Sequence, residues 1–209
     1  MAKKINKFKN LPPNTAVADL IKLIREKLPL FPYSQEIIDV LEKKKNENQH
    51  SLAFCLFMTN ECQSFFYFSR ENSQKGTNVI DIGVYRGSNL IFTLEAKLLP
   101  TPKSSKSRKE YEYVYGHGGG IQRFKDCKHG LDNSHKLLLE SGMLAYIKSE
   151  GFPHWLKKVN KWVDDAGWGT SEQLQKSARF GKIMGVLESN HQRTDGSNIK
   201  LTHFWIKVS

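Results

Sequence analysis

Three residues of this sequence combine types and spacing that could do chemistry, namely Asp81, Glu95 and Lys97. Asp81 stands inside an apolar, β-prone run, and Glu95-Ala96-Lys97 closes the next such run, after a turn at 85–89. Charged residues are rare inside such strands, because burying a lone carboxylate costs several kcal/mol or forces it to take up a proton. Two carboxylates with a lysine two residues beyond the second are what a divalent-metal hydrolytic site requires.

These residues suit the hydrolysis of a phosphodiester, which needs a bound Mg²⁺ or Mn²⁺, an activated water and positive charge facing the phosphorus. Asp81 and Glu95 would supply carboxylate ligands, and the backbone carbonyl of Ala96 could add another. Side chains two apart in a strand share a face, so Lys97 would lie beside Glu95 and reach the attacking water or a phosphate oxygen. The residues expected to face the core instead are Leu94, Ala96 and Leu98.

Asp81, a gap of thirteen residues, and Glu95-Ala96-Lys97 on the next strand resemble the signature of the PD-(D/E)XK nuclease superfamily. The resemblance covers roughly residues 46–128 and implies the restriction-endonuclease-like fold, an α/β fold with a mixed β-sheet core flanked by helices. This sequence departs from the superfamily signature at position 80, where it has Ile80 and the signature has Pro, although many members also lack that Pro. No subfamily is identified, so the substrate and biological role do not transfer.

The resemblance extends to helices on both sides of the strands. The first core helix of superfamily members often carries a further metal-binding acid. Glu47 in Asn46-Glu47-Asn48-Gln49 matches that position. An acid in the first turn of a helix is also favoured by the helix dipole, so Glu47 could be purely structural. Many members place a polar residue on the helix after the Glu-x-Lys strand, and Gln122 or Arg123 fits. Arg123 near a helix start opposes the dipole, which indicates that it serves an anion.

The hydrophobic pattern predicts helices first, then a three-strand antiparallel meander, then helices, then a terminal hairpin. The capping-box order at Asn46-Glu47-Asn48-Gln49 predicts a helix that buries Leu52 and Leu56. Connections between the three meander strands are too short for crossover helices. The expected helices cover 15–28, 34–43, the segment after 46, the segment from 121, 134–150, the segment from 153 and 170–179. The expected closing strands cover 182–188 and 199–208.

The domain organisation predicted from this pattern has a basic arm and helical extension over residues 1–45. A PD-(D/E)XK-like nuclease domain would follow over 46–209, and the two parts could also form one continuous domain. At 209 residues the chain is long enough for one full hydrophobic core.

The net charge of +11 and the pI near 9.5 favour polyanionic partners, with nucleic acid first and an anionic membrane second. The basic arm and the loop at 100–109 would hold the DNA backbone and make affinity salt-sensitive. Two cuts on opposite strands need two sites, so double-stranded DNA and a homodimer are the expected partners. The basic residues expected to contact DNA from the loop are Lys103, Lys106, Arg108 and Lys109.

Other classes are disfavoured by what the sequence lacks. Its three cysteines have no C-x-x-C spacing, and its histidines have no i, i+4 pairing, which argues against zinc and fits a reducing cytoplasm. No apolar run approaches the ~18 residues of a membrane helix. We therefore expect a Mg²⁺- or Mn²⁺-dependent DNA nuclease, with a prokaryotic role in defence, restriction or repair as the resemblance implies. The alternatives are a non-catalytic nucleic-acid-binding module of the same fold and a basic protein that binds another polypeptide.

Overall fold

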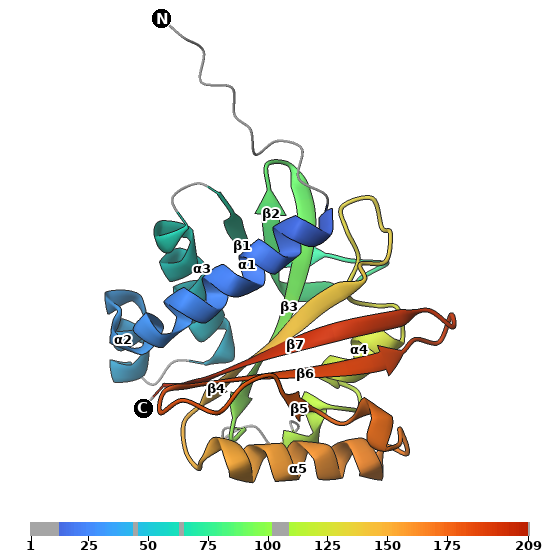
Figure 1. Cartoon of the computed structure of the whole chain (residues 1–209). Coiled ribbons are helices and arrows are strands. Elements are labelled where there is room, and N and C mark those ends of the chain that lie inside the picture. Colours follow the sequence, from blue (N-terminus) through green and yellow to red (C-terminus); the bar gives the residue numbers. More distant parts are fainter. Residues whose placement is uncertain (1–12, 44–45, 63–64, 102–108, 209) are drawn as a thin grey trace, which may run out of the picture.

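A seven-stranded mixed sheet forms the middle of the molecule in the computed structural model, which describes residues 13–43, 46–62, 65–101 and 109–208. The strands lie side by side in the order β1-β2-β3-β4-β7-β6-β5 (Figure 1). Helices flank this sheet, so the expected mixed α/β class is confirmed. In chain order the strands are β1 (Tyr67–Ser73), β2 (Val79–Arg86), β3 (Asn89–Leu99), β4 (Glu140–Ile147), β5 (Gln175–Lys176), β6 (Met184–Gln192) and β7 (Asn198–Lys207).

The helices divide between the two faces of the sheet (Figure 1). Helices α1, α2 and α3 with the 3-10 turn η2 pack on one face, and α4 and α5 with the turn η3 pack on the other. Within the described ranges, no helix has both the length and the apolar composition needed to cross a membrane. In chain order the helical elements are α1 (Pro13–Lys27), η2 (Leu28–Tyr33), α2 (Gln35–Glu42), α3 (Glu47–Glu61), η3 (Glu110–Tyr113), α4 (Gly120–Lys125), α5 (Phe152–Asp165) and η4 (Thr170–Glu172).

Strands β1, β2 and β3 form the predicted antiparallel meander. The turn between β2 and β3 contains Gly87 at φ +61°, a left-handed conformation that glycine adopts without a Cβ clash. The ladder between β2 and β3 runs from the turn only as far as the Ile82–Leu94 pair. Beyond Leu94, β3 continues to Leu99 without β2 as a partner along that edge.

The centre of the sheet is parallel, because β4 pairs in parallel with β3 on one side and with β7 on the other. The prediction of a helix over 134–150 is wrong here, since this segment contains β4. All residues of β4 after Glu140 are buried, because helices cover both faces of a central parallel strand. Such a strand has no alternation of polar and apolar residues, and its continuous apolar run resembles a buried helix.

The helices before residue 45 contribute directly to the core on the first face of the sheet. Leu20 and Ile24 of α1 and Phe31 of η2 are fully buried with Phe54 of α3 and Leu94 of β3. Asn46 caps α3 as predicted, since its side chain accepts a hydrogen bond from the backbone N–H of Gln49 at 3.2 Å. The division of the chain at residue 45 stays a prediction.

The second face of the sheet has an aromatic core. Trp155 of α5 is buried against this face together with Trp205 of β7 and Tyr113 of η3. The helix from Pro153 is confirmed as α5, which also buries Trp162. The helix predicted over 170–179 is wrong, since the chain forms only the short turn η4 and then β5. This second face also carries the candidate site.

Candidate active site

Strand β3 is the scaffold of the site, because it carries Glu95 and Lys97 on the same face of the sheet. The alternate residues Leu94, Ala96 and Leu98 are buried in the core on the opposite face, as predicted. Glu95 is 1% exposed and Lys97 is 15% exposed, so the pair lies at the boundary between core and solvent. The Nζ atom of Lys97 donates to Oε1 of Glu95 at 2.7 Å.

Asp81 reaches β3 from β2 at the point where the two strands separate. Its Oδ2 accepts a hydrogen bond from the backbone N–H of Ala96 at 2.8 Å. This carboxylate therefore replaces the strand partner that β3 loses beyond Leu94. Burial and the nearby Glu95 carboxylate raise the pKa of Asp81 to about 7.

Glu47 approaches the same edge of β3 from the first turn of α3. Its Oε2 accepts from the backbone N–H of Leu98 at 2.8 Å. The N–H groups of Ala96 and Leu98 are two residues apart, so both point from the same edge of the strand. The edge vacated by β2 thus brings together the carboxylates of Asp81 and Glu47.

Lys97 and Arg123 both bind the same oxygen of Glu95. Its Oε1 accepts from Lys97 and from Nη1 of Arg123, the latter at 3.2 Å. Its Oε2 lies 3.3 Å from Nδ1 of His129, and neither of these two buried atoms has a hydrogen bond. Burial acts to raise the pKa of Glu95, but Lys97 and His129 outweigh it and bring the value to about 2. Glu95 is therefore ionised, with one oxygen bound by two cations and the other beside the His129 imidazole without a hydrogen bond of good geometry.

Helix α4 places Arg123 and Gln122 differently. Arg123 binds Glu95, whereas Nε2 of Gln122 donates to Oδ1 of Asp126 at 2.8 Å. Of the loop residues expected to contact DNA, Lys109 is exposed just before η3. The other three, Lys103, Lys106 and Arg108, lie outside the described residues. Contact of any of these residues with DNA stays a prediction.

The expected metal ligands are close together but do not form a ready-made cage. Among the described residues, no three His, Cys, Asp or Glu side chains are grouped so that they could hold a metal ion. Asp81 and Glu47 each use an oxygen on a backbone N–H of β3. The atom that best suits a cation is Oε2 of Glu95, because a buried carboxylate oxygen without a partner costs about 1–3 kcal/mol or more.

His129 is the member of this site that sequence reasoning missed. It lies in the turn after α4, thirty-four positions beyond Glu95, and its ring packs edge-on against Phe124 at a centroid distance of 5.8 Å. The search for zinc ligands by i, i+4 spacing does not find such a residue, since the fold and not local periodicity brings it to Glu95. A histidine that is 1% exposed beside a carboxylate is recognisable only in three dimensions.

A second polar cluster lies on the same face of the sheet, and sequence reasoning missed it too. Its members form a continuous chain of hydrogen bonds, and we call it the buried chain. The contacts are Trp205 Nε1 to Tyr113 Oη at 2.9 Å, Tyr113 Oη to His203 Nδ1 at 2.8 Å, His203 Nε2 to Ser189 Oγ at 2.7 Å, Ser189 Oγ to His191 Nε2 at 2.7 Å and His191 Nδ1 to Glu172 Oε2 at 2.7 Å.

The ends of the buried chain fix the position of every proton in it. Trp205 can only donate and ionised Glu172 can only accept, so each intervening group accepts one hydrogen bond and donates the next. This order holds when His203 and His191 are both neutral. Burial lowers the pKa of both imidazoles, that of His203 well below its ordinary value.

Glu172, His191 and Ser189 have the order of a carboxylate–imidazole–hydroxyl triad, but they do not form a nucleophilic site. Ser189 is 2% exposed, and its Oγ lies between two imidazoles. No substrate carbonyl can reach a hydroxyl in that position. The outer end of the chain is instead anchored by Lys125 of α4, which pairs with Glu172 and lies 4.6 Å from the centre of the Trp168 ring.

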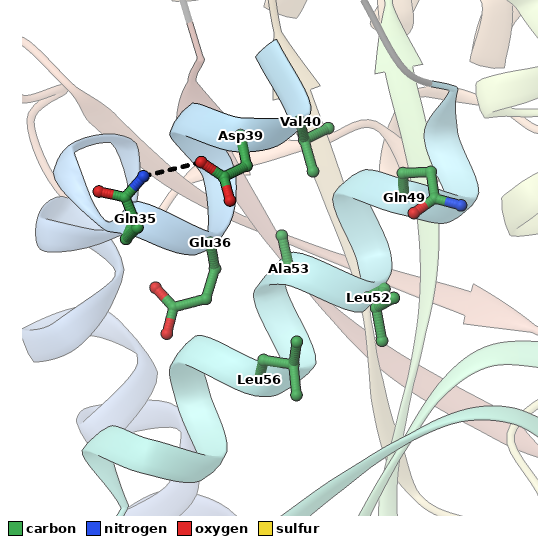
Figure 2. Close-up of a pocket in the computed structure, with 8 residues that line it drawn as sticks. All are labelled: Gln35, Glu36, Asp39, Val40, Gln49, Leu52, Ala53 and Leu56. Carbon is green, nitrogen blue, oxygen red and sulfur yellow. Dashed lines mark hydrogen bonds between the residues drawn. The ribbon is translucent and has the colours of Figure 1, made fainter. Parts of the chain in front are cut away.

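A groove between α2 and α3 is lined by none of the predicted site residues (Figure 2). Leu52 and Leu56 of α3 line it and are 38% and 51% exposed, so the prediction that they are buried is wrong. The helix packs through its other residues, with Phe54, Phe57 and Met58 in the core. The Glu36 and Asp39 side chains of α2 flank the apolar lining of the groove (Figure 2).

Comparison of the chain with protein-family models, with curated proteins and with solved structures finds no match. The side chains around β3 therefore provide the basis for a functional proposal.

Proposed function

We propose that this chain is a metal-dependent nuclease of the PD-(D/E)XK type, with a restriction-endonuclease-like fold, that hydrolyses phosphodiester bonds of DNA. The observation that supports this proposal is the convergence of Asp81, Glu95, Lys97 and Glu47 at the end of β3, where β2 leaves it. These four residues come from two strands and one helix, in the order that the sequence resemblance implies. Restriction-endonuclease-like architecture fits the meander of β1, β2 and β3 with α3 before it and α4 after it.

The donor atoms at this site fit Mg²⁺ or Mn²⁺, since they are mainly carboxylate oxygens. Glu95 would bind through Oε2, which is buried and lacks a hydrogen bond. Asp81 and the Ala96 carbonyl would add oxygen ligands, and Glu47 would assist from α3. When bound, the cation would activate a water molecule and neutralise charge on the scissile phosphate.

Lys97 would act beside the metal on the attacking water or on a phosphate oxygen. Its ammonium group is bound to Glu95 Oε1. Burial acts to lower the pKa of Lys97, but the carboxylates of Glu95, Glu47 and Asp81 together outweigh it and raise that pKa. A lysine that stays protonated suits orientation of the water and neutralisation of phosphate charge better than proton abstraction. Arg123 lies on α4 and would leave its contact with Glu95 to bind and stabilise the phosphate.

The net charge of +11 supports DNA as the substrate, with binding that weakens as salt increases. A homodimer would supply the two sites that cutting both strands of a duplex requires. The residues expected to hold the backbone are the basic Lys103, Lys106, Arg108, Lys109 and Arg123, with the polar Gln122.

The test is cleavage of supercoiled plasmid in Mg²⁺, in Mn²⁺ and in EDTA. We expect nicking or linearisation with metal, no cleavage in EDTA, and a rate loss of roughly 10²–10⁴-fold in Asp81→Asn and Lys97→Ala. Matched controls are Asp19→Asn and Lys22→Ala on the exposed side of α1, which should cut at the wild-type rate. Cleavage that survives both site substitutions would reject the assignment of this site.

The second candidate is a nucleic-acid-binding module without catalysis. It is favoured by the hydrogen bonds of Asp81 and Glu47 to the backbone of β3, because these contacts give both acids a structural role. It predicts salt-sensitive retention of DNA and an intact plasmid in every metal. The two candidates therefore separate in one experiment, which reads both binding and cleavage.

A further inference from the structure

The two buried atoms Glu95 Oε2 and His129 Nδ1 face one another without a hydrogen bond. The other oxygen of Glu95 is already bound by Lys97 and Arg123. Buried polar atoms without partners are rare in folded proteins, and some of them mark a place where an ion binds. Here a carboxylate oxygen and an imidazole nitrogen share this condition at the centre of the candidate site.

The separation of these two atoms is that of an ion pair, and it is also compatible with two ligands on one metal ion. Ligands bound at about 2.0–2.2 Å in octahedral or tetrahedral geometry lie roughly 3.0–3.5 Å apart. Glu95 Oε2 and His129 Nδ1 are 3.3 Å apart. Both atoms could therefore bind the same cation with little movement of either side chain.

The ring of His129 is held in place by α4. The backbone N–H groups of Lys128 and His129 both donate to the carbonyl of Arg123, at 2.9 and 3.1 Å. Phe124 packs against the imidazole at an interplanar angle of 81°. Cys127 turns the chain with φ +55°, a left-handed conformation that directs the next residues back toward the sheet. A ligand fixed in this way loses little conformational freedom when it binds a metal.

We propose that His129 is a nitrogen ligand of the divalent-metal site, bound through Nδ1 beside Glu95 Oε2, and that it makes the site prefer Mn²⁺ to Mg²⁺. Imidazole nitrogen suits transition metals, whereas Mg²⁺ takes oxygen ligands almost exclusively. This inference rests on the proposed nuclease function and narrows its cofactor. Water and substrate phosphate would fill the positions that these protein ligands leave open.

The experiment titrates the metal-free protein with MnCl₂ and separately with MgCl₂, followed by calorimetry. We expect the wild-type protein to bind Mn²⁺ at least about tenfold more tightly than Mg²⁺. His129→Ala should lower the Mn²⁺ affinity about 10–100-fold and the Mg²⁺ affinity much less, so that the preference disappears. The matched control is His154→Ala, which removes an exposed imidazole from α5 and should leave both affinities unchanged.

Pulsed electron paramagnetic resonance of the Mn²⁺-loaded wild-type protein gives a second measurement that needs no variant. We expect a coupling from a directly bound nitrogen nucleus, and its absence in His129→Ala. Mn²⁺ binding without nitrogen coupling, at an affinity that His129→Ala does not change, would overturn the role of His129 and leave the proposed nuclease function standing. No binding of either metal to the wild-type protein, with or without plasmid DNA, would overturn both.

Discussion

Two buried polar clusters lie on the same face of the sheet and differ in how completely their atoms are paired. Glu95 on β3 is in register with Met143 on β4, and Met143 is in register with His203 on β7. The candidate site and the buried chain are therefore separated by one strand, or about 10 Å. In the buried chain each polar side-chain atom named above takes part in a hydrogen bond. In the candidate site, Glu95 Oε2 and His129 Nδ1 have no hydrogen bond.

Under the proposed function, this difference separates a cluster that stabilises the core from one that would bind a ligand. A satisfied polar network rigidifies a core and has nothing left to offer a ligand. An unsatisfied group lowers stability and keeps its binding capacity for a ligand. Helix α4 contacts both clusters, since Arg123 binds Glu95 and Lys125 binds Glu172.

The largest effect is expected when a histidine is removed from each cluster in turn. His203→Ala should lower the free energy of unfolding by about 3–5 kcal/mol, because it leaves a cavity and removes a partner from both Tyr113 and Ser189. His129→Ala should cost at least about 2 kcal/mol less, since it breaks no hydrogen bond of good geometry at Nδ1. Urea denaturation in EDTA, followed by circular dichroism, measures both. Equal losses would contradict the distinction between the clusters.

A smaller effect is expected on the acid side of neutrality. Burial keeps the folded-state pKa of His203 well below 6.5, whereas an unfolded chain protonates it near that value. The unfolded state then binds more protons, so the free energy of unfolding falls as the pH drops below 6.5, by up to about 1.4 kcal/mol per pH unit for this group.

Replacing His203 by glutamine tests the origin of this slope, since the amide cannot titrate in this range. In the wild-type protein the free energy of unfolding declines between pH 6.5 and 5. We expect this slope to become shallower in the variant by about 1.4 kcal/mol per pH unit, the slope that one proton contributes. Urea midpoints across the pH series give the slope for each protein. A variant whose slope equals that of the wild type would show that other groups cause the acid sensitivity.

The smallest effect has the opposite sign and belongs to the candidate site. The pKa of Asp81 is raised from 3.8 to about 7, so its contribution to stability is present at low pH and is lost as the pH rises through 7. Asp81→Asn keeps an oxygen for the Ala96 N–H and carries no charge. In EDTA at pH 8 it should raise the free energy of unfolding by on the order of 1 kcal/mol, and the gain should shrink as the pH falls below 7.

Thermal and urea unfolding at pH 5 and pH 8 provide the measurement for Asp81→Asn. Asp19→Asn on α1 is the control, since Asp19 is exposed and should change stability little at either pH. Destabilisation by Asp81→Asn at pH 8 would mean that the ionised carboxylate is satisfied in the metal-free protein.

Local pattern was sufficient to predict the meander and the grouping of the acids. Strand alternation placed Glu95 and Lys97 on one face, and short turns forced β2 and β3 to be neighbours, which brought Asp81 to β3. Strand β4 could not be predicted in this way, because a strand covered on both faces has no alternation of polarity. Its continuous apolar run also fits a buried helix.

The two missed clusters differ in how much signal the sequence contains. Ser189 and His191 are two apart on β6 and share a face, so this spacing was a signal from which a buried polar network could have been predicted. His129 offers no such signal, since it follows α4 in a turn without periodicity. Only the packing of α4 against β3 brings it to Glu95.

The separation of β2 from β3 beyond Leu94 has a consequence for how this protein could diverge over evolution. The N–H groups of Ala96 and Leu98 at this edge need acceptors whether or not the protein cuts DNA, and Asp81 and Glu47 provide them. Under the proposed nuclease function, a descendant that lost activity would therefore keep both acids for the sake of its fold. Lys97 and His129 have no such structural duty toward the strand backbone, so their loss is the mark by which an inactive descendant would be recognised.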